Sequence, residues 1–214
     1  MKGYYTAPEK GVWEQVIEKS RFIGVVYPVA GLGEIEAARR EVRAQYPAAK
    51  HYVYAYRLVE GKAEKSSDDG EPQGTGGRPI LEILQYRELW DVLVVVVRYF
   101  GGILLGTGGL TRAYGGTVKE LLAKTGVTLL TPHVAYRLKV PYSWYENVKY
   151  HLRGRAWPVK DEIFREDVEL AVWVPQAETE RFKAWLEEFA GGQVSSEEEG
   201  VVWAGTAADL EQKA

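Results

Sequence analysis

The sequence predicts an α+β protein with two domains, and three observations lead to this prediction. Short β-branched and aromatic runs alternate with amphipathic helical stretches along the 214 residues. Glycines concentrate in one part of the first half, since 11 of the 23 lie between residues 70 and 116. Beyond residue 133 the elements follow a new order, β-α-β-β-α-β, which indicates a second domain.

The first domain opens with a predicted strand pair and a helix. Residues 12–17 and 21–27 are two β-branched and aromatic runs separated by polar residues, which predicts two strands. Apolar residues recur at helical spacing in residues 33–45, and Pro47 follows as a stop signal. We therefore expect an amphipathic helix after the strand pair.

The middle of the first domain contains a strand, a long loop, a helix and a second strand. Residues 51–58 alternate in the manner of a strand, whereas residues 60–79 are too polar and glycine-rich to predict regular structure. A helix is predicted over residues 80–89. Residues 92–97 are all apolar, so we expect a central strand that is covered on both faces.

A second glycine-rich turn is predicted over residues 99–109. A helix over residues 111–124 and a short strand over residues 127–130 follow it. Pro132 and His133 are interpreted as a linker to the second domain.

The remaining elements are strands and helices in the order β-α-β-β-α-β. The strands are expected over residues 136–140, 157–164, 169–174 and 201–203, and the helices over residues 144–154 and 178–189. This is the order of a ferredoxin-like fold, in which two helices cover one face of an antiparallel sheet. We expect domains over residues 1–131 and 134–207, and a tail over residues 208–214.

Composition excludes several classes of function. The chain has no cysteine and 3 histidines, which argues against disulfides, thiolate metal sites and a histidine-built zinc site. Its longest apolar run, residues 92–97, is far shorter than the roughly 20 residues that span a bilayer. We expect a cytoplasmic protein without a membrane partner, a cofactor or a recognisable catalytic residue.

Charge is distributed unevenly around a formal net charge of −3. Residues 1–130 contain 17 basic and 15 acidic side chains, residues 131–165 contain 7 and 3, and residues 166–214 contain 3 and 12. The acidity therefore belongs to the last quarter of the chain, and the rest is mildly basic. A nucleic-acid partner is compatible with this distribution.

An acidic cluster lies in the predicted long loop. Asp68, Asp69 and Glu71 fall within four residues and precede a glycine-rich run and Arg78. Clustered carboxylates suit a hard cation such as Mg²⁺, and one of them could also serve as a general base. The interpretation that we favour is structural: the carboxylates accept backbone N–H groups in successive turns and cap the next helix.

The second glycine-rich turn offers backbone amides to an anion. A strand runs into glycines and a helix then begins, so the turn presents N–H groups and the positive end of a helix dipole. The candidate anion-binding residues are Arg98, Gly106, Thr107, Gly108, Gly109, Thr111 and Arg112. In the alternative interpretation, the glycines only let the helix pack tightly on the sheet. No Gly-Lys-Ser/Thr sequence follows at P-loop spacing, which excludes that class of nucleotide hydrolase.

Aromatic and basic residues interleave on the strand of residues 51–58. Tyr52, Tyr54 and Tyr56 share one face, and the other face carries His51, Val53, Ala55 and Arg57. Aromatic rings beside cations stack nucleic-acid bases and hold phosphates. The alternative is that the tyrosine face is part of the core.

Four motifs in this order resemble the signature of the IMPACT family, in its bacterial YigZ-like members. They are Lys19-Ser20-Arg21-Phe22-Ile23, the run from His51 to Arg57, Ser67-Asp68-Asp69-Gly70-Glu71-Pro72 with Pro79-Ile80-Leu81, and Arg98-Tyr99-Phe100-Gly101-Gly102 with Gly109-Leu110-Thr111-Arg112-Ala113-Tyr114. The C-terminal segment resembles the small ferredoxin-like domain of these members by its pattern of elements.

This resemblance implies a fold for each domain and a role in translation. The expected N-terminal domain is similar to the second domain of ribosomal protein S5, and the pair of domains resembles the fourth and fifth domains of elongation factor G. Eukaryotic members of the family regulate translation through the amino-acid-starvation kinase, and they carry an additional N-terminal RWD domain. This sequence leaves no room for such a domain before residue 12, so we do not transfer that interaction.

We therefore expect a non-enzymatic factor that binds RNA or the ribosome and influences translation, without DNA specificity. Its expected contacts to RNA are Arg21, His51, Tyr54, Tyr56, Arg57, Arg78, Arg98 and Arg112, together with the glycine-rich turn. The alternative is an enzyme that binds a phosphorylated or nucleotide-like small molecule at that turn, with Mg²⁺ held by Asp68, Asp69 or Glu71. A third interpretation is a protein-interaction module whose acidic C-terminal part docks a basic partner.

Overall fold

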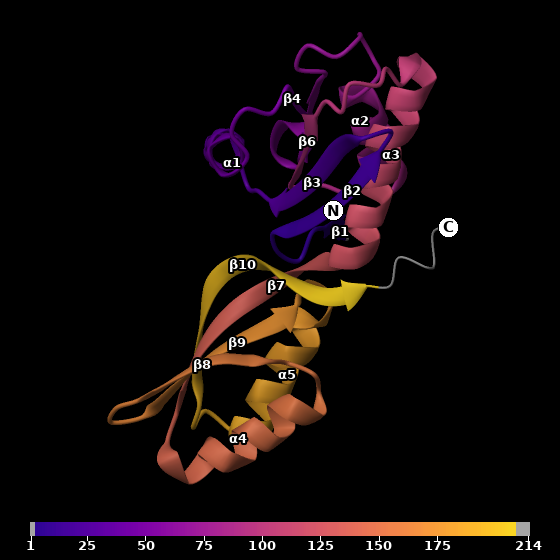
Figure 1. The fold of residues 1–214 in the computed structure, drawn as a ribbon. Coiled ribbons are helices and arrows are strands. Elements are labelled where there is room, and N and C mark those ends of the chain that lie inside the picture. The colour runs from indigo at the N-terminus through magenta and orange to yellow at the C-terminus, as the bar shows by residue number, and fades with distance from the viewer. Residues whose placement is uncertain (1–2, 209–214) are drawn as a thin grey trace. The chain divides into compact units, whose positions relative to one another are not determined.

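The computed structural model describes residues 3–208, which divide into two units (Figure 1). The first unit contains Gly3–Leu129 together with residues 205–208, and the second contains Leu130–Ala204. Each unit combines helices with an antiparallel sheet, so the predicted α+β class is confirmed. The tail predicted over residues 208–214 lies, from residue 209 onward, outside the described residues.

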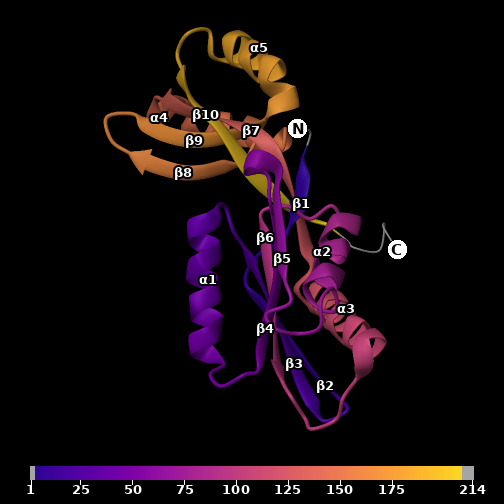
Figure 2. The same cartoon turned by 90° about the horizontal axis from the view of Figure 1, so that it is seen from above.

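The first unit is built on a five-stranded antiparallel sheet. Its strands are β2 (Gly11–Ile17), β3 (Ser20–Pro28), β4 (His51–Leu58), β5 (Ala63–Ser67) and β6 (Val92–Tyr99), and their order in the sheet is β2-β3-β6-β4-β5. Three helices cover it, namely α1 (Leu32–Gln45), α2 (Gly77–Tyr86) and α3 (Gly106–Thr125). Figure 2 shows α1 on one face of this sheet and α2 and α3 on the other.

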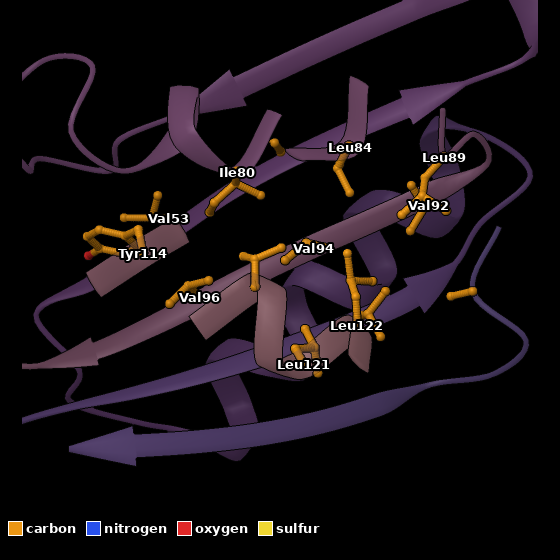
Figure 3. Close-up of a cluster of buried hydrophobic side chains, with 14 of the residues drawn as sticks. Val53, Ile80, Leu84, Leu89, Val92, Val94, Val96, Tyr114, Leu121 and Leu122 are labelled. Carbon is orange, nitrogen blue, oxygen red and sulfur yellow. The ribbon is translucent and has the colours of Figure 1, made fainter. Parts of the chain in front are cut away.

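The central strand β6 explains why both faces of this sheet are buried. Val92, Val94 and Val96 pack into the cluster beneath α2 and α3, where Figure 3 shows them beside side chains of both helices. Their neighbours along the strand, Leu93, Val95 and Val97, belong to the cluster on the α1 side. Residues 92–97 are all apolar because side chains on both faces of this strand are buried. The predicted central strand is confirmed.

The long loop predicted over residues 60–79 is wrong in part. A 3-10 turn (Glu60–Lys62) and β5 occupy its first half, and α2 begins at Gly77, so the irregular part is residues 68–76. The sequence of β5, Ala-Glu-Lys-Ser-Ser, lacks an apolar face because β5 is an edge strand that pairs only with β4.

The glycine-rich turn after β6 is shorter than predicted, and the linker is wrong. Helix α3 begins at Gly106, so Gly106, Gly108 and Gly109 of the predicted turn lie in its first helical turn, and Gly101 and Gly102 remain before it. Strand β7 (Val127–Val140) runs through Pro132 and His133. Pro132 immediately precedes His133, the first residue paired with β9, so its missing N–H removes no bond from that ladder.

The second unit has the predicted β-α-β-β-α-β order. After β7 come α4 (Tyr142–Gly154), β8 (Val159–Phe164), β9 (Val168–Pro175), α5 (Thr179–Ala190) and β10 (Ser195–Ala208). In its sheet β9 lies between β7 and β8, and β10 also pairs with β7. Strand β1 (Tyr4–Thr6), which is three residues long and was not predicted, belongs to the first unit and pairs with β7, whose first residues lie in that unit. No helix in residues 3–208 is long and apolar enough to cross a membrane.

Candidate anion-binding surface

A buried ion pair lies where β6 ends. The Arg98 Nη1 donates to Glu71 Oε1 at 2.7 Å, and the two side chains are 5% and 4% exposed. The hydroxyl of Tyr114, on α3, donates to the same carboxylate oxygen at 2.8 Å. A buried charge requires a close partner, so these contacts hold the loop of residues 68–76 to both the central strand and α3.

Strand β3 joins this polar cluster through its first residue, Ser20. The Ser20 hydroxyl accepts hydrogen bonds from Arg98 Nη2 at 3.3 Å and from the Gly101 N–H at 3.1 Å. A Cβ on Gly101 would lie 2.0 Å from the carbonyl carbon of Lys19, so only glycine fits this close approach. The close packing of these two segments is therefore the reason for this glycine.

The imidazole of His51 contacts the acidic loop from β4. Its Nδ1 lies 2.8 Å from the carbonyl oxygen of Asp69, and its Nε2 lies 3.8 Å from Glu71 Oε1. The Asp69 carboxylate accepts the Tyr52 N–H at 2.7 Å and pairs with Arg43 of α1 at 3.0 Å. His51 and Asp69 thus fasten the loop to the start of β4.

Asp68 caps helix α2 from outside the helix. Its carboxylate accepts hydrogen bonds from the backbone N–H groups of Gly74, Gly76 and Gly77 at 2.8–2.9 Å. Partial burial acts to raise the pKa of this carboxyl, but the three donors together hold the pKa below its ordinary value. The glycines have no side chains to cap the helix, so a residue upstream supplies the acceptor.

The three carboxylates predicted as metal ligands or as a general base therefore serve separate structural partners. Asp68 binds backbone N–H groups, Asp69 binds β4 and α1, and Glu71 binds Arg98 and Tyr114. Across residues 3–208, no group of three or more acidic, histidine or cysteine side chains is placed to hold a metal ion. These contacts favour the capping interpretation over a Mg²⁺ site.

The burial of the β4 tyrosines favours the alternative in which this face belongs to the core. Tyr54 and Tyr56 are only 6% and 9% exposed because α1 covers this face of the sheet. The guanidinium of Arg39, on α1, lies 4.0 Å from the centre of the Tyr54 ring. These tyrosines are core residues, and their ring faces are not free to stack on a base.

Arg57 and His51 are likewise unavailable to a phosphate. Arg57 is 7% exposed, donates to the carbonyl oxygens of Leu84 and Leu89 at 3.1 and 3.0 Å, and pairs with Glu64 at 2.7 Å. It satisfies carbonyl groups at and beyond the C-terminal end of α2, where a helix leaves acceptors without internal partners. His51 is also 7% exposed. Together with the buried Arg98, they support the fold.

The remaining candidates lie on the surface. Arg21 pairs with Glu14 and Arg78 pairs with Glu82, each at 2.7 Å. Arg112 is exposed and forms no ion pair within residues 3–208. The structure brings one group of candidates together in the first two turns of α3, namely Gly106, Thr107, Gly108, Gly109, Thr111 and Arg112.

A groove of about 720 Å³ lies beside these residues, between α2 and α3, which Figure 2 shows side by side. Arg87, Arg112 and Lys119 line it, and none of their side chains forms an ion pair with another described residue. Among its described lining residues, the acidic side chain is Glu82, whose charge is balanced by Arg78. The groove therefore presents an excess of positive charge, which suits an anionic ligand.

Sequence reasoning missed most of the lining of this groove, including Tyr86, Arg87 and Lys119. The α3 side of this groove could have been found from the helical spacing of its residues in the sequence. Arg112 and Lys119 are seven residues apart with Gly115 and Gly116 between them, so all four share one face of α3.

Three of the seven basic side chains of residues 131–165, those of Arg137, Lys149 and Arg165, form ion pairs within the second unit. Lys149 pairs with Glu162 at 2.9 Å and Arg137 pairs with Glu199 at 2.6 Å. The acidic side chains near the C-terminus thus meet cations of the same unit. Fewer cations of this segment are available to an anionic partner than the count of basic residues indicates.

Comparisons with known families match both halves of the chain. The Impact N-terminal domain matches residues 18–122, and a domain of unknown function, DUF1949, matches residues 138–193. The chain is 38% identical over 194 residues to the IMPACT family member YvyE of Bacillus subtilis, covering 90% of this chain and 89% of that protein. It is 37% identical over 183 residues to the IMPACT family member YigZ of Escherichia coli, covering 83% and 89%.

Two solved structures match this chain over different shares of its length. The crystal structure of a hypothetical protein is 32% identical, with a TM-score of 0.61, and the match covers 92% of this chain and 97% of that one. The two-domain translational regulator Yih1 is 22% identical with a TM-score of 0.33, covering 56% and 46%. That second likeness is too low to assign a role to any residue here.

Proposed function

Because this chain belongs to the IMPACT family, we propose that it is a non-enzymatic factor that binds RNA or the ribosome and acts in translation. One observation supports the binding part most directly. Arg87, Arg112 and Lys119 line one groove without carboxylate partners among the described residues. Cations that are already paired gain little from a phosphate, whereas unpaired cations gain a full charge interaction.

The translation part of the proposal rests on the family. The resemblance of the four motifs implies regulation of translation, and the matches to bacterial IMPACT family members cover most of this chain. A factor of this kind works in the cytoplasm, where ribosomes are found.

The contacts of the acidic loop weigh against the enzymatic alternative. The acidic loop supplies no free carboxylate, because Asp68, Asp69 and Glu71 are each occupied by structural partners. A reaction at the glycine-rich helix end would therefore lack the base or metal ligands that we assigned to it.

The test measures binding to ribosomal subunits and to RNA directly. Co-sedimentation with purified subunits and fluorescence anisotropy with labelled RNA are carried out at about 50 and 200 mM salt, since phosphate contacts weaken strongly over this range. We expect salt-sensitive binding to at least one of them. Absence of binding to subunits and to every RNA at the lower salt concentration would disprove the proposal.

A pair of matched variants assigns the binding to the first unit. The double variant Arg112→Ala and Lys119→Ala removes two unpaired cations from α3. The control, Arg181→Ala and Lys183→Ala, removes two cations from α5 that are 69% and 52% exposed. We expect the first variant to weaken binding and the control to retain it. An equal loss in both would mean that binding follows overall charge and not this surface.

A further inference from the structure

We infer that the groove between α2 and α3 binds single-stranded RNA, with phosphates held by Arg87, Arg112 and Lys119 and a base stacked on Tyr86. This inference rests on the proposed function, and it adds the kind of RNA and the side chains that contact it. Its basis is that four independent features of this groove fit a flexible anionic strand with exposed bases.

The first feature is the charge of Arg87. Its Nη1 is buried and has no hydrogen-bond partner within residues 3–208. A guanidinium nitrogen without a partner is unfavourable, and an anion beside Arg87 would balance the charge that the protein leaves unpaired. Arg87 lines the groove, so a phosphate there lies next to this cation.

The second feature is the exposure of Tyr86. This side chain lines the groove and is 71% exposed. Within the described residues, its ring stacks on no other ring and its hydroxyl has no hydrogen-bond partner. The tyrosines of β4 are covered by α1, whereas the ring of Tyr86 is open to a base and lies beside unpaired cations. An aromatic ring next to positive charge is the usual platform for single-stranded RNA.

The third feature is the pair of glycines in the middle of α3. Glycine destabilises a helix interior relative to alanine, so its presence there usually has a packing reason. A Cβ on Gly115 would lie 3.7 Å from Ile83, and one on Gly116 would lie 3.8 Å from Gln15, which are ordinary contact distances. Packing within the protein does not require these glycines. Their effect is to leave the groove open between Arg112 and Lys119.

The fourth feature is the size of the groove. A volume of about 720 Å³ lies within the range that pockets for small organic ligands occupy. It suits one or two nucleotides of a strand rather than the width of a duplex. In a duplex the bases are also stacked inside, so a ring such as Tyr86 has no base face to contact.

The experiment uses the full chain and a labelled 12-nucleotide oligouridine, with a duplex of the same length and inorganic phosphate as competitors. The variants are Tyr86→Ala and Tyr86→Phe. The control is Tyr150→Ala, which removes a tyrosine of α4 that is 75% exposed. We expect Tyr86→Ala to weaken binding by about 5-fold to 160-fold, the range that loss of one base stack gives. Tyr86→Phe and Tyr150→Ala should bind as the unaltered protein does.

A second pair of variants tests the open groove without removing a charge. Gly115→Leu places a side chain in the groove, and Gly115→Ala adds only a methyl group at ordinary contact distance. We expect Gly115→Leu to weaken oligouridine binding strongly and Gly115→Ala to weaken it less. Thermal unfolding of both variants shows whether a loss of binding comes from loss of the fold.

The outcomes separate this inference from the proposed function. If the unaltered protein binds RNA or ribosomal subunits but the Tyr86 and Gly115 variants bind equally well, RNA lies elsewhere and the groove inference is wrong. Preferential binding of the duplex, or displacement of oligouridine by millimolar phosphate alone, would also overturn it. If the protein binds neither RNA nor subunits, both proposals fail.

Discussion

Arg98 of β6 and Glu71 of the acidic loop form an ion pair of 2.7 Å in which both side chains are at most 5% exposed. The pair links the central strand to a loop 27 residues earlier, and Tyr114 adds a third element through the same carboxylate oxygen. Arg98 is therefore a structural residue, and we expect its substitution to lower the stability of the fold whether or not it also affects binding.

We expect Arg98→Ala to lower the free energy of unfolding by about 3–5 kcal/mol, because it leaves the Glu71 carboxylate buried without its main partner. Arg78→Ala is the matched control, since Arg78 pairs with Glu82 on the exposed surface of α2 and is 76% exposed. That change should stay within about 0.5 kcal/mol. Urea unfolding of both variants is the measurement, and similar losses in the two would contradict a structural role for Arg98.

Tyr114 should make stability fall at high pH. Burial, and then the neighbouring Glu71 carboxylate, raise the pKa of the Tyr114 hydroxyl far above its ordinary value of 10.0. The unfolded chain loses this proton above about pH 10 and the folded chain keeps it, so the contribution is present below pH 10 and is lost as the pH rises further.

The variant Tyr114→Phe tests this linkage. At pH 7 it should be less stable by about 1.5–3 kcal/mol, because a hydrogen bond to a charged acceptor is lost. Above pH 10 its stability should fall less steeply than that of the unaltered protein. Urea unfolding at pH 7 to 11 measures both effects, and parallel alkaline curves for the two proteins would refute the assignment.

Asp68 should contribute to stability at neutral pH and lose that contribution in acid. Its pKa is lowered in the folded state by three backbone donors that outweigh the opposing effect of burial. The contribution is thus present above the ordinary pKa of 3.8 and is lost as the pH falls through the lower folded value. Asp68→Ala should cost about 1–2 kcal/mol at pH 7, the range for a lost helix cap.

The measurement is the urea midpoint of both proteins between pH 7 and 3. The difference between the unaltered protein and Asp68→Ala should shrink as the pH falls below about 4. Glu120→Gln, which alters an exposed carboxylate of α3, is the control and should leave the midpoint unchanged at pH 7. A constant difference at every pH would mean that the charge of Asp68 is not what caps α2.

Most of the fold could be predicted from the sequence because the spacing of apolar residues along the chain indicates which faces of a helix or strand are buried. The run of residues 92–97 is apolar on both faces and is the central strand, and the second unit follows the predicted order. The elements that were missed lack such a signal. Strand β5 is polar because it lies at an edge, and the start of α3 is rich in glycines that resemble a turn.

The candidate site was harder to predict because one sequence does not show which face of a strand is covered. Alternation placed Tyr54 and Tyr56 together, but only the position of α1 decides that this face is core. In the same way, a count of arginines does not reveal that Arg57 and Arg98 are buried and paired. The unpaired cations of the groove come from two helices that meet only in the folded chain.

Arg112 and Arg21 were both expected to contact phosphate, and the structure predicts different salt dependence for their variants. Arg21 is neutralised by Glu14 through two hydrogen bonds of 2.7 and 2.9 Å, whereas Arg112 has no ion-pair partner among the described residues. A cation releases counterions from RNA only if it contacts phosphate, and each such contact adds about 0.7 to the slope of log affinity against log salt for a single strand. Arg112→Ala should therefore lower the slope for oligouridine by about 0.7, and Arg21→Ala should leave it unchanged.

Anisotropy titrations at four or more salt concentrations give both slopes. A lower slope for Arg21→Ala with an unchanged one for Arg112→Ala would place the phosphate contacts on the β2–β3 hairpin instead of on α3, because Arg21 belongs to β3 and pairs there with a residue of β2.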